Sequence, residues 1–119
     1  NFNAFEPVPA ATMHSSINVA VTKNLTVVPV KDGGYLMIKA ADLKGAKKFV
    51  IKANSEKEGG NVILKKDNAA NGEIIAKIDI PGGKKAIELS SEITKDFDVS
   101  QIYLVLSGNI ELLQWQLGK

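Results

Sequence analysis

The side chains that could perform chemistry are few and scattered along the chain. His14 is the only histidine, and Ser15 and Ser16 follow it directly. A serine–histidine pair needs a third group that orients the ring, and adjacency in sequence does not create that arrangement. We therefore interpret His14 as a surface residue of a turn and not as a catalytic base.

Paired carboxylates are the second possible source of chemistry, because glycoside hydrolysis uses two carboxyl groups about 5 to 10 Å apart. Glu56 and Glu58 share one turn, and Asp96 and Asp98 share another. Carboxylates at turn tips are solvated and lack the burial that separates an acid from a base. The segment GGYLMIKAADLKG also lacks the Lys-Ser/Thr pair that ends a phosphate loop. The sequence predicts no catalytic residues.

Composition excludes several other classes of function. The chain has 119 residues, which fit one domain spanning 1–119. The net charge is only +2, and all 15 basic residues are lysines, so the bidentate arginine contacts typical of nucleic-acid recognition are absent. There is no cysteine for a disulfide framework or a thiolate metal site. No apolar stretch reaches the roughly 18 residues of a membrane-spanning helix. We expect neither a nucleic acid nor a membrane as a partner.

The elements that would position a site are predicted by period-two alternation of apolar residues. The run EIIAKIDI ends at Pro81 and places Ile74, Ile78 and Ile80 on one face. The run QIYLVLSG is apolar on both faces, which is typical of a central strand. Near the C-terminus, ELLQWQL places Leu113, Trp115 and Leu117 on one face. We expect a core that includes Ile51, Ile74, Ile78, Ile80, Leu104 and Leu106.

Turn signals separate these runs at regular intervals. Glycine pairs or single glycines occur in DGG, KEGG, NAANG and PGG. Pro29 cannot donate a ladder hydrogen bond, so its strand is an edge or is interrupted there. Eight to ten short strands with turns every eight to twelve residues predict an all-β protein, a two-sheet antiparallel β-sandwich.

From Gly34 onward the order of motifs resembles family-six carbohydrate-binding modules, which are β-jelly-roll domains appended to secreted plant-polysaccharide hydrolases. The matching segments are GGYLMIKAADL, KFVIKANSEKEGGNVILKKD, GEIIAKIDIPGG, IYLVLSG and ELLQWQL, and PAATM matches the opening motif of such modules. The resemblance covers nearly the whole chain. It implies a jelly roll, a location that is secreted, periplasmic or on the bacterial cell surface, and a place as a C-terminal piece of a longer enzyme.

The resemblance also implies a sugar site in the loops at one end of the sandwich, where two aromatic rings clamp a sugar and an asparagine binds it. The corresponding stretches here, VVPVKD and GGKK, contain no aromatic residue, and the asparagine position falls near Glu111. On this interpretation the end-loop site is absent or is rebuilt. The candidate sugar-binding residues are Tyr35, Lys84, Lys85, Asn109, Glu111 and Trp115.

Family members hold a structural calcium with carboxylates, but the matching positions here are Pro9, Ala11 and Leu113. Calcium takes six to eight oxygen ligands, so these substitutions remove most of the shell. Glu6 is the one candidate remnant ligand. We expect no cofactor, although the resemblance allows for a structural calcium.

Two functions remain open at this point. The first is a non-catalytic module that binds plant polysaccharide of the xylan or arabinan type and directs an attached glycoside hydrolase to it. The second is a structural accessory domain of the same origin that has lost sugar binding and packs against a catalytic domain. The missing aromatic clamp favours the second function, and the usual role of the family favours the first.

Overall fold

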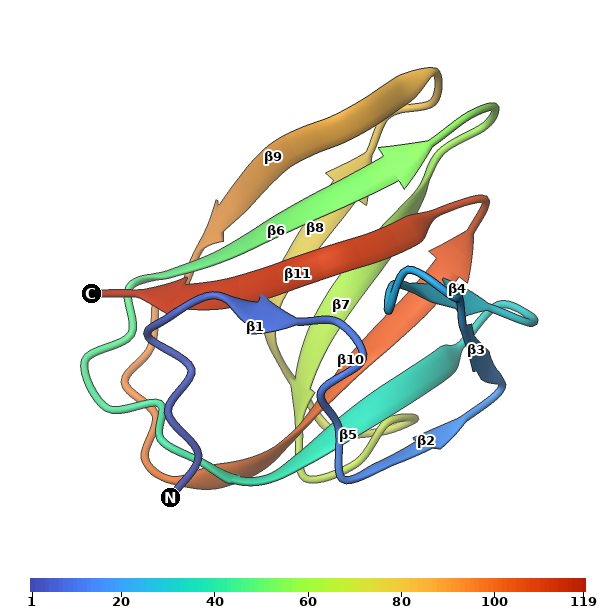
Figure 1. Cartoon of the computed structure of the whole chain (residues 1–119). Coiled ribbons are helices and arrows are strands. Elements are labelled where there is room, and N and C mark those ends of the chain that lie inside the picture. The colour runs from blue at the N-terminus through green and yellow to red at the C-terminus, as the bar shows by residue number, and fades with distance from the viewer.

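A computed structural model describes the whole chain, residues 1–119, as a β-sandwich without helices (Figure 1). This architecture confirms the predicted fold class. The count of eleven strands exceeds the expected eight to ten because four strands have only two or three residues. None of the segments is a helix that could cross a membrane. The strands are β1 (Val8–Pro9), β2 (Ser15–Ile17), β3 (Val19–Val21), β4 (Val27–Pro29), β5 (Gly34–Ala41), β6 (Lys48–Ser55), β7 (Gly60–Lys66), β8 (Glu73–Ile80), β9 (Lys84–Glu92), β10 (Ser100–Gly108) and β11 (Glu111–Gly118).

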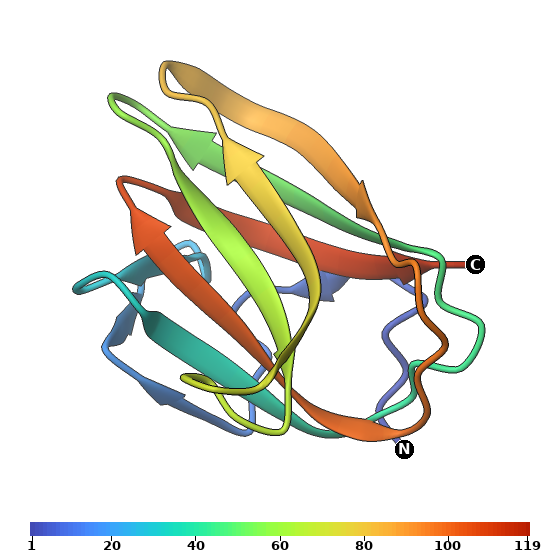
Figure 2. The same ribbon diagram turned by 180° about the vertical axis from the view of Figure 1, so that it is seen from behind.

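The two sheets form the two layers of the sandwich. The first sheet has the order β3-β4-β11-β6-β9, and β1 also pairs with β11. The second has the order β2-β5-β10-β7-β8 and forms the layer seen in front in Figure 2. Strand β10 is central in its sheet, between β5 and β7, as the apolar run QIYLVLSG predicted. Strand β4 meets β11 through a single residue pair and ends at Pro29, which agrees with the predicted interruption.

Alternating side chains fill the space between the sheets. Ile51, Ile78, Ile80, Leu104 and Leu106 are buried as predicted. The prediction for Ile74 is wrong, because its side chain is 55% exposed. The pairing of β7 with β8 shifts register between Leu64 and Lys65, which inserts Ile75 as an extra residue. This β-bulge turns Ile75 inward and Ile74 outward.

A second bulge alters the face of β11. Its register with β6 shifts between Leu112 and Gln114, so Leu113 is the extra residue. Leu112 is therefore fully buried, and Leu113 is only half-buried. The prediction that Leu113 shares the inward face of Trp115 and Leu117 is wrong. Strict alternation in the sequence could not reveal the inserted residue.

The turns gather at the two ends of the sandwich. The β4–β5, β6–β7, β8–β9 and β10–β11 turns lie at one end, at the right and upper right of Figure 1. The chain termini lie toward the other end, where Phe2 N–H donates to the Ala40 carbonyl at 2.9 Å and Lys47 N–H donates to the Gly118 carbonyl at 2.7 Å. The first of these ends carries the candidate site.

Candidate functional site

A hollow of about 240 Å³ lies among the turns at the end of the sandwich away from the termini. Strand β4, the end of β6, the start of β9 and the β10–β11 turn form its wall. Most of the lining residues are polar or charged, and none is aromatic. The lining residues are Val28, Pro29, Asn54, Ser55, Glu56, Lys85, Gly108, Asn109, Ile110 and Glu111. We call this hollow the end pocket.

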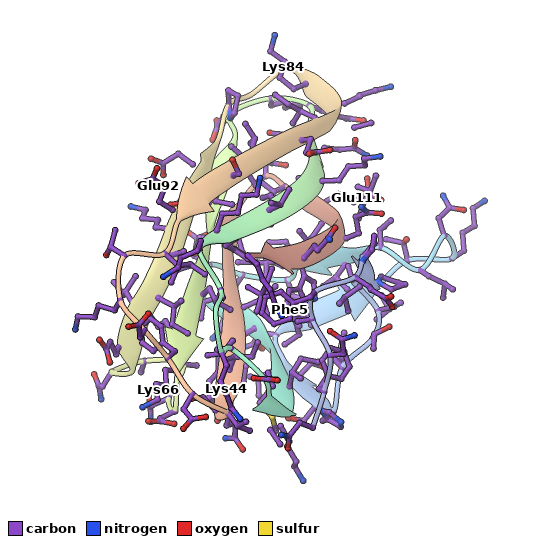
Figure 3. The ribbon with its side chains drawn as sticks, turned by 90° about the vertical axis from the view of Figure 1, so that its left-hand side faces the viewer. Phe5, Lys44, Lys66, Lys84, Glu92 and Glu111 are labelled. Atoms are coloured by element: carbon purple, nitrogen blue, oxygen red, sulfur yellow. The ribbon has the colours of Figure 1, made fainter.

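Glu111 is the best-anchored side chain of the end pocket, at the first position of β11 (Figure 3). Its Oε1 accepts a hydrogen bond from Asn54 Nδ2 at 2.9 Å, and its Oε2 accepts one from the Thr26 hydroxyl. The bond from Thr26, and then that from Asn54, hold the pKa of the Glu111 carboxyl below its usual value, against the opposing effect of partial burial. The side chain is therefore an ionised acceptor that is fixed in position before any ligand arrives.

Asn54 links the two sides of the end pocket. Its Nδ2 donates to Glu111, and its Oδ1 accepts the backbone N–H of Ala86 at 2.5 Å. Ala86 has a left-handed backbone, with φ of 49°, at a point where the register of β6 with β9 shifts. This bulge determines the backbone direction directly after Lys85, whose side chain lines the end pocket. The side-chain amide of Asn54 thus fixes Glu111 on one side of the end pocket and the backbone next to Lys85 on the other side.

The turns around the end pocket are packed against one another without space for side chains. Gly108 has φ of 89°, and a Cβ built there would lie 2.5 Å from the Gly59 carbonyl oxygen. The backbone N–H of Asn109 donates to that same carbonyl at 3.0 Å, and the Ser55 hydroxyl donates to the Asn109 carbonyl at 2.8 Å. These contacts hold the β6–β7 and β10–β11 turns together at the end pocket. Position 108 requires glycine, because no other residue fits both its backbone angle and the space beside Gly59.

Three of the predicted site residues come together in the end pocket, namely Lys85, Asn109 and Glu111. Lys84 is exposed on the neighbouring position of β9 and is not part of the lining. Tyr35 lies elsewhere: it alternates with buried Leu36 on β5, so it sits on the outer face of the second sheet. There its ring meets that of Tyr103 edge to face, with 5.3 Å between centroids.

The proposal of Trp115 as a sugar-binding residue needs correction. Its side chain is fully buried, stacked on Phe2 and tilted against Phe49, with both ring centroids 6.3 Å away. Its Nε1–H is buried without a hydrogen-bond partner. The inward face of β11 places it in the core, where no polysaccharide reaches it.

Sequence reasoning missed Thr26, Asn54 and Glu56 as members of the site or of its support. Asn54 and Glu56 line the end pocket, and Thr26 holds Glu111 from a distance of 85 positions in the chain. A weak signal existed for Asn54, a polar residue with outward alternation near the end of β6. The hydrogen bonds from Thr26 and Asn54 to Glu111 depend on how β4, β6 and β11 pair, and this register is not evident from the sequence.

The residues that correspond to the calcium ligands of the resembling family do not fit a calcium ion. Glu6 is exposed, Pro9 and Ala11 have no side-chain oxygen, and Leu113 is apolar. The carbonyls of Pro9 and Leu113 already accept the backbone N–H groups of Thr12 and Ala10. No group of three or more His, Cys, Asp or Glu side chains in the chain is arranged to hold a metal. The side-chain carboxylates that the resemblance assigns to a calcium are therefore missing at Pro9, Ala11 and Leu113.

A second hollow, of about 300 Å³, lies at the opposite end, near the β9–β10 loop. Its lining is strongly charged and includes Lys66, Asp96 and Asp98. Lys95 Nζ forms an ion pair with Glu73 at 2.6 Å, and this hydrogen bond is the main cause that lowers the pKa of the Glu73 carboxyl. The other charged groups of this hollow also form ion pairs, but with Lys44, Lys47 and Asp67 outside its lining. In the end pocket, by contrast, Lys85 and Glu56 take part in no ion pair.

No family model matches the chain, and no curated protein sequence matches it either. Solved structures do match. A family 6 carbohydrate-binding module from Clostridium cellulolyticum in complex with xylose is 18% identical, with a TM-score of 0.87, over 99% of this chain and 100% of that one. A β-1,3-glucan-binding module of family 6 from Bacillus halodurans is 13% identical, with a TM-score of 0.84, over 98% of both chains.

A third match extends beyond a single domain. The family 43 arabinoxylan arabinofuranohydrolase of Bacillus subtilis, in complex with cellotetraose, is 20% identical with a TM-score of 0.86. The match covers 100% of this chain but only 28% of the hydrolase. The fold of the chain is therefore that of family 6 carbohydrate-binding modules, which also occurs as one part of a larger enzyme. The matched structures that align over nearly their whole length are binding modules and not enzymes.

Proposed function

We propose that this chain is a non-catalytic carbohydrate-binding module whose ligand site is the end pocket. The observation that carries the proposal is the arrangement of Glu111. Its carboxylate is ionised, fixed by two hydrogen bonds and open to the end pocket, and a carboxylate has lone pairs for about four hydrogen bonds. Two acceptor positions remain for hydroxyl groups of a ligand.

The other free groups of the end pocket complement a polyhydroxylated ligand. Lys85 supplies a donor, Glu56 supplies acceptors, and the side-chain amide of Asn109 supplies both. Sugar hydroxyls donate and accept at once, so a sugar satisfies this mixed set better than a purely anionic or cationic ligand does. We propose neutral polysaccharide of the xylan or arabinan type, in support of which the matched structures include a xylose-bound module and an arabinoxylan hydrolase.

We further propose that the module is secreted or held at the cell surface, where it directs an attached glycoside hydrolase to this polysaccharide. The match to one part of an arabinofuranohydrolase supports this role. The absence of aromatic side chains in the end pocket supports the second candidate, a structural domain that packs against the catalytic domain without binding sugar.

Titration calorimetry with xylo- and arabino-oligosaccharides distinguishes these two functions. Each neutral hydrogen bond contributes about 1 kcal/mol net. A site without ring stacking should therefore bind with a dissociation constant on the order of 1 mM, about −4 kcal/mol. Glu111→Gln should weaken binding roughly fivefold, because hydrogen bonds to a charged acceptor are stronger.

The matched control is Glu92→Gln, which removes the same charge from the exposed far end of β9 (Figure 3). Binding should be unaffected in this variant. Equal affinity of wild type and Glu111→Gln would exclude the end pocket as the site. Absence of binding to every oligosaccharide would refute the module function and leave the structural one.

A further inference from the structure

Thr26, which holds the carboxylate of Glu111, is itself held by a second threonine. Thr26 is one of only three buried polar residues in the chain, and its hydroxyl lies 2.6 Å from the hydroxyl of Thr22. The two residues face each other across the β3–β4 turn, where Thr22 N–H donates to the Thr26 carbonyl at 2.9 Å. Neither threonine lines the end pocket. A chain of side-chain hydrogen bonds therefore leads from this turn, through Thr26, to Glu111 in the end pocket.

The direction of the hydrogen bond between the two hydroxyls follows from the other partners of Thr22. A hydroxyl has one proton to donate and two lone pairs with which to accept. The Thr22 oxygen already accepts the backbone N–H groups of Asn24 and Thr26, both at 3.3 Å. Thr22 therefore donates its own proton to the Thr26 hydroxyl. An ionised carboxylate can only accept, so Thr26 donates its proton to Glu111.

This order of donors matters because Thr26 has a single proton to give. The proton from Thr22 occupies a lone pair of the Thr26 oxygen, which leaves the Thr26 proton directed at Glu111. Hydrogen bonds in a chain also polarise one another, so donation by Thr22 strengthens the donation by Thr26. Thr22 thus contributes to holding Glu111 ionised and in place, although it lies outside the end pocket.

We propose that Thr22 is a positioning residue of the ligand site, which acts on a bound sugar only through Thr26 and Glu111. This proposal rests on the proposed function and adds to it a residue outside the end pocket that sets the affinity. The competing explanation is local. By accepting the N–H of Asn24, two positions further on, the Thr22 hydroxyl forms a turn of the kind that serine and threonine favour. A purely local role would stabilise this turn without any effect on Glu111.

The test compares wild type, Thr22→Val, Thr26→Val and the double variant in NMR titrations with xylotetraose. Valine keeps the shape of threonine and removes the hydroxyl. Thr26→Val should weaken binding about threefold, because it removes a hydrogen bond to the carboxylate that contacts the ligand. Thr22→Val should weaken binding about twofold, because only the strengthening of that bond is lost. The double variant should bind as Thr26→Val does, since Thr22 has no other route to the ligand.

The ionisation of Glu111 gives a second measurement, which needs no ligand. Carbon NMR of the side-chain carboxyl follows its pKa directly. Because donated hydrogen bonds favour the ionised form, Thr22→Val should raise the pKa of Glu111, and Thr26→Val should raise it further. The double variant should match Thr26→Val. Thr22→Ser, which keeps the hydroxyl, should restore both the affinity and the pKa of wild type. The matched control is Thr94→Val, at an exposed threonine of the β9–β10 loop, and it should change neither.

The outcomes separate this proposal from the proposed function. Thr22 would have no positioning role if Thr22→Val left the pKa of Glu111 unchanged, even with a loss of affinity, because the effect would then be local to the turn. Effects of the two single variants that add up in the double variant would also overturn the proposal, while the end pocket would remain the ligand site. Failure of wild type to bind xylotetraose would overturn the proposed function, and the role of Thr22 in binding with it.

Discussion

Glu111 is a residue whose chemistry is set entirely by its neighbours. Thr26 reaches it from the β3–β4 hairpin and Asn54 reaches it from β6, so three distant parts of the chain meet at one carboxylate. Both hydrogen bonds favour the ionised form, which lowers the pKa of the carboxyl in the folded state. The protonation state of Glu111 is therefore linked to folding as well as to ligand binding.

The sign of this linkage gives a prediction for stability. Because the folded-state pKa of Glu111 is below its unfolded value of about 4.3, its contribution to stability is present above that pH and is lost as the pH falls through the folded-state value. The difference in unfolding free energy between wild type and Glu111→Gln should be larger at pH 7 than at pH 3. Urea denaturation at the two pH values measures it.

Glutamine suits this experiment because it keeps the shape of the side chain. Its carbonyl accepts from Asn54, and its amide donates to the Thr26 hydroxyl, which acts as donor or acceptor. Glu92→Gln serves as the control for the general effect of net charge. A difference between wild type and Glu111→Gln that is the same at both pH values would contradict the anchoring role of Thr26 and Asn54.

Residue types at the site were partly predictable. Lys85, Asn109 and Glu111 could be named because the resembling family places its site at the corresponding turns. Asn54 and Thr26 could not, since their roles come from hydrogen bonds between strands that are distant in sequence. Trp115 was misplaced as a candidate because a tryptophan suits either a sugar platform or a core, and only its burial decides between them.

At the level of the strands, the predicted and the observed structures differ at the β-bulges of β8 and β11. Alternation correctly placed Ile51 of β6 and Leu104 and Leu106 of β10 in the core, where the register with the neighbouring strand is unbroken. It failed for Ile74 and for Leu113, each of which lies at or beside an inserted residue. A one-residue insertion reverses the faces on one side of it, and no composition signal marks its position.

The bulge in β8 can be tested by a pair of substitutions. Ile75→Ala should cost about 2–4 kcal/mol of unfolding free energy, because it leaves a cavity in the core. Ile74→Ala should cost less than about 1 kcal/mol, since the side chain is mostly solvated and only strand propensity changes. Chemical denaturation of the two variants gives the comparison. The reverse order would mean that β8 follows the uninterrupted alternation and has no bulge.

At the scale of the whole molecule, the sandwich keeps the end pocket and the chain termini far apart. The end pocket lies among the β4–β5, β6–β7, β8–β9 and β10–β11 turns, and both termini lie toward the opposite end (Figure 1). A domain joined at either terminus would therefore leave the end pocket open to a polysaccharide. Most of the ion pairs, including Lys44–Asp98 and Lys47–Asp96, lie at the end with the termini. They are exposed, and such pairs contribute little to stability.

The central claim is that the end pocket binds neutral oligosaccharide without a metal. It is tested most directly by a titration of the isotope-labelled protein with xylotetraose in the presence of EDTA, followed through backbone amide NMR shifts. We predict saturable changes at Asn54, Glu56, Lys85 and Asn109, with a dissociation constant on the order of 1 mM and no effect of added calcium. No change at these amides at tens of millimolar sugar, or changes confined to the outer face around Tyr35 and Tyr103, would contradict the claim.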